Sequence, residues 1–332
     1  ANKRKSIKRS KKTIKIKGVY MDGIIIINKE KNWTSNDIVH KLKGIFHEKV
    51  GHTGTLDPQA TGVLPILIGK GTNLSKYLIN HDKEYIATIK LGTKTSTADG
   101  EGKIIETKNV SEIMLEEDYI KKVLESFIGN QTQIPPMYSA IKVNGKKLYD
   151  YARKGQKVEV QPRNIKIYDI KLVGISKEEK EIKYKENCSK GTYIRTLSEN
   201  IAEKLGTVGF MKNLNRTMVG EFLINQAIKI SDVEEILKNG NNIEEKIITV
   251  EKFFENKPRI ELNDNNLKKF LNGVLVYLKT KDGVYKIYNK NTFVGSGVIR
   301  ENKLKRDIIT LIGWHKQRKS GIIYLLKHKL YA

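Results

Sequence analysis

Cysteine is nearly absent from this chain: Cys188 is the sole example among 332 residues. One thiol excludes an internal disulfide framework and a cysteine-based zinc site, and it agrees with a reducing, cytoplasmic location. The histidines lack the spacing of a zinc-binding motif, so we expect no metal. Long apolar runs are also absent. The longest unbroken aliphatic run, Ile24 to Ile27, is far too short to cross a bilayer, and we expect no membrane partner.

Acidic residues are scarce relative to basic ones. Lys and Arg number 62 whereas Asp and Glu number 37, which gives a formal net charge of +25 at pH 7. Such an excess favours a polyanionic partner, most simply a nucleic acid. An anionic membrane surface is the rival interpretation, but the sequence contains no basic amphipathic helix to bind one. The length and the 39% hydrophobic content predict one large domain and a smaller one.

Both ends of the chain are basic. Residues 1–20 contain no acid, which predicts a disordered, solvated tail with nonspecific affinity for nucleic acid. A mitochondrial presequence is the alternative, although such sequences favour Arg over Lys. Residues 314–332 form the second basic tail.

Residues 21–250 have the pattern of a mixed α/β (α+β) domain. A short buried strand at 24–27 precedes a helix for which Ser35 is the expected N-cap. A further helix is expected between Ser111, as its cap, and Gly129, as its stop. One clear strand shows strict alternation, which places on one face the residues Tyr85, Ala87, Ile89 and Leu91.

The C-terminal part, residues 251–313, is rich in strand-forming residues. It predicts a small β barrel, and Asp282-Gly283 is the expected hairpin turn within it.

Residues 134–160 form an insertion in which cations and tyrosines are interleaved. Pro135-Pro136 interrupt regular structure at its start. Basic and aromatic side chains in alternation suit a segment that grips RNA, whereas a solvated basic face is the plainer interpretation. The cations that we expect to contact the substrate are Lys142, Lys146, Lys147 and Arg153.

The stretch from Gly51 to Gly62, "GHTGTLDPQATG", has the period of neither a helix nor a strand. Asp57 precedes Pro58, which disfavours helical backbone, and the glycines permit sharp turns around it. A carboxylate presented into a cleft acts as a nucleophile or a general base, while turn chemistry alone is the alternative. The stretch does not match a phosphate-binding P-loop.

Arg195 lies in the first turn of a predicted helix, "TYIRTLSENIAEKL". A cation there opposes the helix dipole, at about 0.3–1 kcal/mol, unless an anion compensates. No acid lies in the preceding turn, so a carboxylate from elsewhere in the fold is expected, and Asp57 is one candidate. A surface arginine that turns into water is the alternative.

Five segments, in order, resemble the TruB-type tRNA pseudouridine synthases, which isomerise the T-loop uridine at tRNA position 55. They are "GHTGTLDPQATGVLPI", "KEYIATIKLGTKTSTADGEG", "QIPPMYSAIKVNGKKLYDYARKG", "CSKGTYIRTLSENIAEKLG" and "LNRTMVGEF". The third resembles the family's RNA-binding thumb, and "TFVGSGVI" is similar to part of a PUA domain. The resemblance implies a pseudouridine synthase fold with a central mixed or antiparallel sheet, a thumb insertion and a PUA-like β barrel.

By position, the resemblance implies that Asp57 attacks the target nucleotide and that Arg195 pairs with its carboxylate. Tyr85 matches a tyrosine that stacks on the flipped uracil and takes part in proton transfer. Tyr193 and Leu214 match residues of the uracil pocket, and His52 matches a histidine that contacts the RNA. Lys29 also remains from a substrate-binding motif, but here the stretch from Lys29 to Ser35 lacks the family's Pro and Gly.

The implied reaction detaches uracil from its ribose, rotates it and rejoins it through carbon. It is redox-neutral and needs no cofactor. The expected partner is the tRNA T-arm stem-loop, bound by a monomer without guide RNA. Two alternatives stay open: a dyskerin-like synthase in a guide-RNA particle, which lacks the thumb, and a noncatalytic RNA-binding protein.

Overall fold

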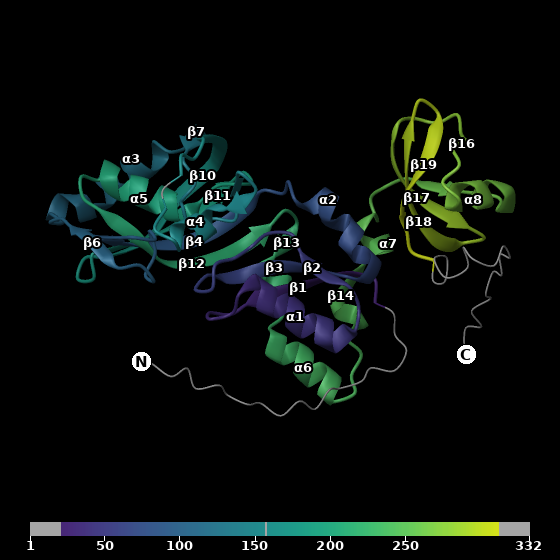
Figure 1. Cartoon of the computed structure of the whole chain (residues 1–332), viewed down its shortest axis with the longest axis horizontal. Coiled ribbons are helices and arrows are strands. Elements are labelled where there is room, and N and C mark those ends of the chain that lie inside the picture. The colour runs from purple at the N-terminus through teal and green to yellow at the C-terminus, as the bar shows by residue number, and fades with distance from the viewer. Residues whose placement is uncertain (1–20, 157, 312–332) are drawn as a thin grey trace.

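The computed structural model describes residues 21–156 and 158–311 (Figure 1). The two predicted tails, residues 1–20 and 314–332, lie outside the described residues. The described chain contains a large sheet with helices packed on it and a smaller C-terminal sheet. None of the helices in this part of the chain is long and apolar enough to span a membrane.

The large sheet has the strand order β14-β1-β3-β12-β4-β11-β10-β7, with β2 paired to β3 and β13 paired to β12. All its pairs are antiparallel except that of β12 with β3, so the predicted mixed sheet is confirmed. Its strands are β1 (Gly23–Lys29), β2 (Val50–His52), β3 (Thr61–Ile68), β4 (Lys83–Leu91), β7 (Gly129–Gln133), β10 (Arg163–Ser176), β11 (Glu181–Cys188), β12 (Gly209–Val219), β13 (Phe222–Leu223) and β14 (Ile247–Thr249).

The run of four isoleucines in β1 is buried on both faces of this sheet. Ile25 and Ile27 join one hydrophobic core, and Ile24 and Ile26 join another. The first core is covered by helices, whereas the second continues into the C-terminal part of the chain. The helices that contribute to the first core are α1 (Ser35–Phe46), α3 (Glu117–Glu125), α5 (Ile194–Lys204) and α6 (Ile230–Lys238).

Helix α1 shows where the sequence pattern was one residue off. Ser35 was the predicted N-cap, but Thr34 is the N-cap, and its hydroxyl accepts a hydrogen bond from the backbone N–H of Asp37. The Asp37 carboxylate in turn accepts from the N–H of Thr34, which completes a capping box. Ser35 is instead buried, and its hydroxyl exchanges hydrogen bonds with the backbone of Leu56.

The predicted helix from Ser111 to Gly129 is also corrected. A 3-10 helix, Glu112–Leu115, comes first, and the chain is extended at Glu116 before α3 begins. Helix α3 ends at Glu125, and Gly129, with φ of +108°, starts strand β7. By contrast, the alternation from Tyr85 to Leu91 in β4 is confirmed, since all four predicted residues are buried.

The short elements follow the same order along the chain. They are the 3-10 helices Gly69–Leu74, Ile224–Gln226 and Glu244–Lys246, the helix α2 (Ser75–Leu78) and the hairpin of β5 (Thr93–Thr95) with β6 (Ile104–Thr107). Within residues 134–160, which we call the thumb, a hairpin of β8 (Lys142–Val143) and β9 (Lys146–Lys147) leads into α4 (Leu148–Ala152). Leu148 is fully buried and anchors this segment.

The C-terminal sheet has the order β15-β17-β18-β19-β16 and curls into a half-barrel beside α8 (Asp264–Leu271) (Figure 1). Its strands are β15 (Arg259–Glu261), β16 (Val276–Tyr277), β17 (Gly283–Asn289), β18 (Thr292–Arg300) and β19 (Lys303–Ile309). The predicted hairpin at Asp282-Gly283 is wrong, because β16 pairs with β19 and not with β17. The hairpin turns lie at Lys290-Asn291 and Glu301-Asn302, all with positive φ.

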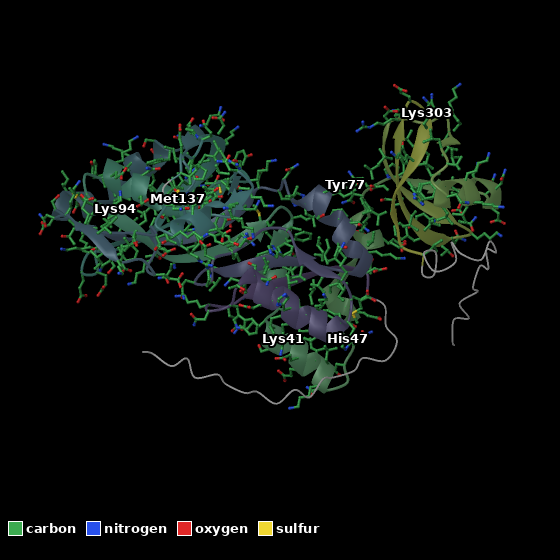
Figure 2. The ribbon with its side chains drawn as sticks, viewed as in Figure 1. Lys41, His47, Tyr77, Lys94, Met137 and Lys303 are labelled. Atoms are coloured by element: carbon green, nitrogen blue, oxygen red, sulfur yellow. The ribbon has the colours of Figure 1, made fainter. Side chains whose placement is uncertain are left out.

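The two sheets meet at α2 and α7 (Val250–Phe253). Tyr77 of α2 lies on the side of the large domain that faces the C-terminal sheet (Figure 2), where its ring packs against Phe253 and Phe254. Its hydroxyl donates to the carboxylate of Asp307 in β19 at 2.5 Å. Ile308 of the same strand is buried in the second core, so the domains share apolar surface.

Candidate active site

Asp57 and Arg195, predicted as partners, form an ion pair. The distance from Arg195 Nε to Asp57 Oδ2 is 3.1 Å. Arg195 follows Ile194 at the start of α5, where the N-cap residue Tyr193 offers no side-chain cap and the first turn contains no acid. The Asp57 carboxylate, brought in by the loop between β2 and β3, therefore supplies the anion that this helix start lacks.

A second carboxylate faces the same guanidinium. Asp99 Oδ2 lies 3.6 Å from Arg195 Nη1, and its side chain is 13% exposed. Arg195 also donates to two carbonyls, of Tyr138 at 2.9 Å and of Thr97 at 3.3 Å. With only 8% of its side chain exposed, Arg195 is held from several directions. It ties the thumb to residues 53–60, the loop between β2 and β3 that holds Asp57 and that we call the catalytic loop.

Burial sets the acidity of Asp57. Desolvation raises the pKa of its carboxyl above the ordinary value, and the nearby charge of Asp99 adds to this effect. Arg195 and, more weakly, Lys29 act in the opposite direction without cancelling it. Since 39% of the side chain is still exposed, the carboxylate is both poorly solvated and reachable.

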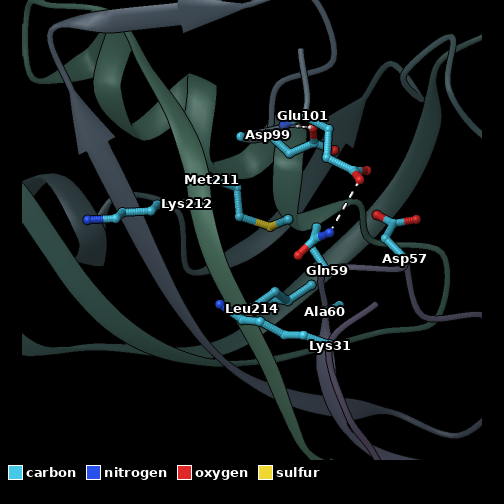
Figure 3. Close-up of a pocket in the computed structure, with 10 residues that line it drawn as sticks. Lys31, Asp57, Gln59, Ala60, Asp99, Glu101, Met211, Lys212 and Leu214 are labelled. Atoms are coloured by element: carbon cyan, nitrogen blue, oxygen red, sulfur yellow. Dashed lines mark hydrogen bonds between the residues drawn. The ribbon is translucent and has the colours of Figure 1, made fainter. Parts of the chain in front are cut away.

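A cavity of about 280 Å³ opens beside Asp57 (Figure 3). Its apolar lining is formed by Ala60, Met211 and Leu214, and its polar lining includes Gln59 and Glu101, which are joined by a 3.4 Å hydrogen bond. Asp99, Lys31 and Lys212 complete the polar side. An apolar wall beside an ionisable carboxylate can hold a nucleobase next to a nucleophile.

The structure brings only some of the predicted residues to this cavity. Leu214 lines it with Asp57, whereas His52, Tyr85 and Tyr193 do not. Tyr193 is fixed by Gln133, whose amide exchanges two hydrogen bonds with the Tyr193 backbone. His52 accepts a 3.3 Å hydrogen bond from the Gly54 N–H, and burial together with Arg216 lowers the pKa of its imidazole.

Tyr85 is 7% exposed and belongs to a row of side chains that crosses three strands. It is paired with Arg216 of β12 on one side and with Glu186 of β11 on the other. Burial raises the pKa of its hydroxyl to about 12, so it is protonated at neutral pH. Glu186 is equally buried, and desolvation raises its pKa to about 8.

Arg216 holds the catalytic loop in place through hydrogen bonds to backbone carbonyls, a role that the sequence did not predict. Its side chain is fully buried and donates to the carbonyls of Val63 at 2.8 Å and Gly54 at 3.1 Å. It thereby ties the start of the loop to β3. The block "LNRTMVGEF" contained this residue, but only the register of β12 beside β3 and β4 shows what it contacts.

Lys29 is a correction. It was predicted to bind substrate, but it has no exposed surface, and its ammonium donates to the carbonyls of Glu30, Trp33 and Pro58. Burial lowers the pKa of Lys29 to about 8, although the charge of Asp57 partly offsets this. Lys29 thus holds the backbone next to Asp57 in place and has no surface open to solvent.

The stretch that departs from the family pattern closes onto the same loop. Asn32 stands where the family has glycine and adopts φ of +66°, a conformation that asparagine tolerates better than most residues. Its N–H donates to the Pro58 carbonyl at 2.9 Å, and its side-chain oxygen accepts from Gln59 at 3.0 Å. The turn is therefore bonded to the catalytic loop with Asn32 in place of glycine.

The predicted thumb cations lie on the hairpin and the helix end. Lys142 and Lys146 are exposed, and Lys147 donates to the Tyr149 hydroxyl at 3.0 Å. Lys147 and Arg153 both approach the Tyr149 ring, at 5.2 Å each. None of the four lines the cavity at Asp57. No group of three or more residues able to hold a metal occurs among residues 21–156 and 158–311.

Two family profiles match adjacent parts of the chain. The profile described as "TruB family pseudouridylate synthase (N terminal domain)" matches residues 42–194, and "tRNA pseudouridylate synthase B C-terminal domain" matches residues 195–269. A "tRNA pseudouridine synthase B" of Francisella philomiragia subsp. philomiragia is 42% identical over 291 residues, which are 86% of this chain and 93% of that protein. One from Francisella tularensis subsp. tularensis is 41% identical, with the same coverage.

Solved structures agree on the fold. The structure described as "Structure of H/ACA RNP bound to a substrate RNA containing 2'-deoxyuridine" has a TM-score of 0.62 at 23% identity, covering 88% of this chain and 86% of that one. "Crystal Structure of a Cbf5-Nop10-Gar1 Complex" has a TM-score of 0.60 at 25% identity, covering 87% and 83%. The predicted pseudouridine synthase fold is thus confirmed. The chain belongs to the TruB family of pseudouridylate synthases.

Proposed function

We propose that this enzyme converts the uridine at position 55 in the T loop of tRNA to pseudouridine, with Asp57 as the attacking group. The observation that carries the proposal is the ion pair of Asp57 with Arg195 at the edge of a cavity whose other wall is apolar. The "tRNA pseudouridine synthase B" relatives, with about two-fifths of residues identical, supply the substrate class. The proposed setting is the cytoplasm and the proposed active form a monomer.

In the proposed reaction the target nucleotide first leaves the stack, at a cost of a few kcal/mol. The Asp57 carboxylate attacks this nucleotide, the glycosidic bond to nitrogen breaks, and the base rotates. The base then rejoins the ribose through carbon, the aspartate leaves, and the proton displaced from that carbon returns to nitrogen. No electrons are gained or lost overall and no fragment is released, so the residues of the site suffice as reactants.

The other site residues take supporting roles in this proposal. Arg195 favours the ionised carboxylate against desolvation. Leu214 forms the apolar wall of the uracil pocket, and Tyr193, at the start of α5 two residues before Arg195, contacts the uracil once RNA is bound. Tyr85 stacks on the base and passes a proton, which requires the cavity to widen toward β4, because only 7% of Tyr85 is exposed before RNA binds. His52 contacts the RNA at the place in the base stack that the flipped uracil has left.

The thumb favours action on free tRNA over action in a guide-RNA particle. It presents Lys142, Lys146, Lys147 and Arg153 on a hairpin and a short helix, and its Tyr138 carbonyl is bonded to Arg195. A thumb tied to the catalytic arginine offers the protein's own grip on RNA next to the site. We propose that no guide RNA is required.

The decisive experiment incubates the purified protein with a T-arm stem-loop, without guide RNA, and maps pseudouridine by nucleotide position. Product is expected at the T-loop uridine, with none from Asp57→Asn even though that variant still binds the RNA. The matched control is Asp118→Asn, the same change at an exposed acid of α3, which should keep full activity. Folded protein that yields no product, or product at a different uridine, would contradict the proposal.

A further inference from the structure

Lys31 contributes to the lining of two cavities. It lines the cavity beside Asp57 and also a second, more open cavity of about 400 Å³ on its other side. The second cavity lies between the end of β1, the start of β3 and strand β12, with Thr61, Asn215 and Lys229 in its lining. In Figure 3 the Lys31 side chain runs beside Leu214 along the wall of the first cavity.

The backbone that carries Lys31 is fixed to the catalytic loop. The preceding Lys29 and the following Asn32 both donate to the Pro58 carbonyl, one residue beyond Asp57. From this turn the Lys31 ammonium reaches β12, where it donates to the side-chain oxygen of Asn213 at 2.8 Å. Its position relative to Asp57 is therefore set by hydrogen bonds on both sides.

The charge of Lys31 is not neutralised by a neighbour. It is exposed and forms no ion pair with the described residues, whereas Lys212 in the same wall is paired with Glu181. In the second cavity the sole lining acid, Glu30, lies 3.7 Å from Lys229. The side-chain oxygen of Asn215 accepts a hydrogen bond from the Thr61 hydroxyl. Its amide NH2 group has no partner among the described residues and is available to a ligand.

We propose that the second cavity binds a backbone phosphate and its ribose directly adjacent to the flipped uridine, with Lys31 as the phosphate ligand. This inference rests on the proposed function. Flipping swings a nucleotide out about its backbone, so the flanking phosphates follow the base toward the pocket. An unpaired ammonium beside polar amide and hydroxyl groups matches a phosphate and a ribose. Lys31 thereby positions the backbone, and Asp57 acts on the nucleotide.

The test pairs a protein change with an RNA change. Two T-arm stem-loops carry an uncharged methylphosphonate, one on the 5′ side and one on the 3′ side of the target uridine. Binding is measured in an Asp57→Asn background, so that no turnover intervenes. At one of the two positions the methylphosphonate should weaken binding about tenfold, and in Lys31→Gln the same RNA should lose no further affinity. If the loss caused by Lys31→Gln multiplies with the loss caused by the methylphosphonate at both positions, the proposal is overturned.

Two further readouts separate a local contact from a general effect of charge. Lys31→Gln should raise KM and leave kcat within about twofold, and it should flatten the salt dependence of binding by about 0.7 in log–log slope. Lys177→Gln removes the same charge outside both cavities and should leave the slope unchanged, because Glu116 already pairs with it. Equal flattening in both variants overturns the inference. If the protein with Asp57 intact makes no pseudouridine, the proposed function fails instead.

Discussion

At Arg195 one guanidinium faces two carboxylates, and the balance between them determines when Asp57 is ionised. Arg195 lowers the pKa of Asp57, whereas Asp99 and, above all, burial raise it. In the proposed reaction the attacking form is the carboxylate, so activity should be lost as the pH falls through the raised pKa. The acid limb of the pH–rate profile should therefore lie above the ordinary range for an aspartate.

Opposite shifts of this limb are expected from the two partners of Asp57. Arg195→Met removes a favourable charge, so the limb should move to higher pH, and the maximal rate should fall roughly 100-fold. Asp99→Asn removes a repulsive charge, so its limb should move to lower pH. Single-turnover rates of pseudouridine formation across the pH range measure both. Shifts in the same direction would mean that Asp57 is not the titrating group.

Residue-level prediction succeeded where a local rule applied and stopped where a contact depends on the fold. The need of Arg195 for an anion was predictable, because a cation in an uncapped first turn lacks a compensating charge, but the choice of Asp57 among the candidates came from the family resemblance. The contacts of Asp99 and Arg216 were not predicted, since no local rule marks either residue and the fold alone brings them to the site. Lys29 was misassigned because burial of a lysine depends on which carbonyls surround it, and the sequence does not show them.

At the scale of elements, turns were predicted less well than strands. The alternation in β4 could be predicted without knowing the packing, because residues two apart in a strand always share a face. The hairpins at Lys290-Asn291 and Glu301-Asn302 use residue pairs without glycine in a left-handed conformation, so the usual signal was missing. Asp282-Gly283 carried that signal but follows a stretch that pairs elsewhere.

The thumb hairpin is expected to act as an electrostatic grip. Replacing Lys146 and Lys147 together by Gln should weaken binding of the T-arm stem-loop and flatten its log–log salt dependence by about 1.5. The fold should persist, because the anchor Leu148 is untouched. The measurement is binding over a range of salt concentrations.

The matched control for the thumb removes the same charge elsewhere. Lys171 and Lys177 are exposed and paired with Asp169 and Glu116, so the double change of both to Gln should leave the salt slope as it was. If the control flattens the slope equally, the net charge of +25, and not the thumb, accounts for the binding.

At the scale of the whole molecule, the two sheets are joined by a shared core and by polar contacts that include one buried carboxylate. Phe254 and Ile308 pack in the same hydrophobic cluster, although the C-terminal half-barrel has a separate core of its own. Asp307 is 7% exposed and accepts hydrogen bonds from Tyr77 and Ser296, besides its ion pair with Lys76. The orientation of the half-barrel relative to the active site depends on this junction.

Asp307→Ala should loosen the junction, because the hydroxyls of Tyr77 and Ser296 both lose the acceptor of their hydrogen bonds. We expect a loss of about 2–3 kcal/mol in the free energy of unfolding, and about 1 kcal/mol for Tyr77→Phe, which removes one hydroxyl while keeping the ring. Calorimetry should show the C-terminal domain of Asp307→Ala unfolding in a separate transition at lower temperature. Glu301→Ala, at an exposed turn of the same domain, should leave the profile unchanged. One unaltered transition in Asp307→Ala would show that the shared apolar surface and the remaining contact of Lys70 with the Leu311 carbonyl hold the domains together, since the buried carboxylate would then contribute nothing to their coupling.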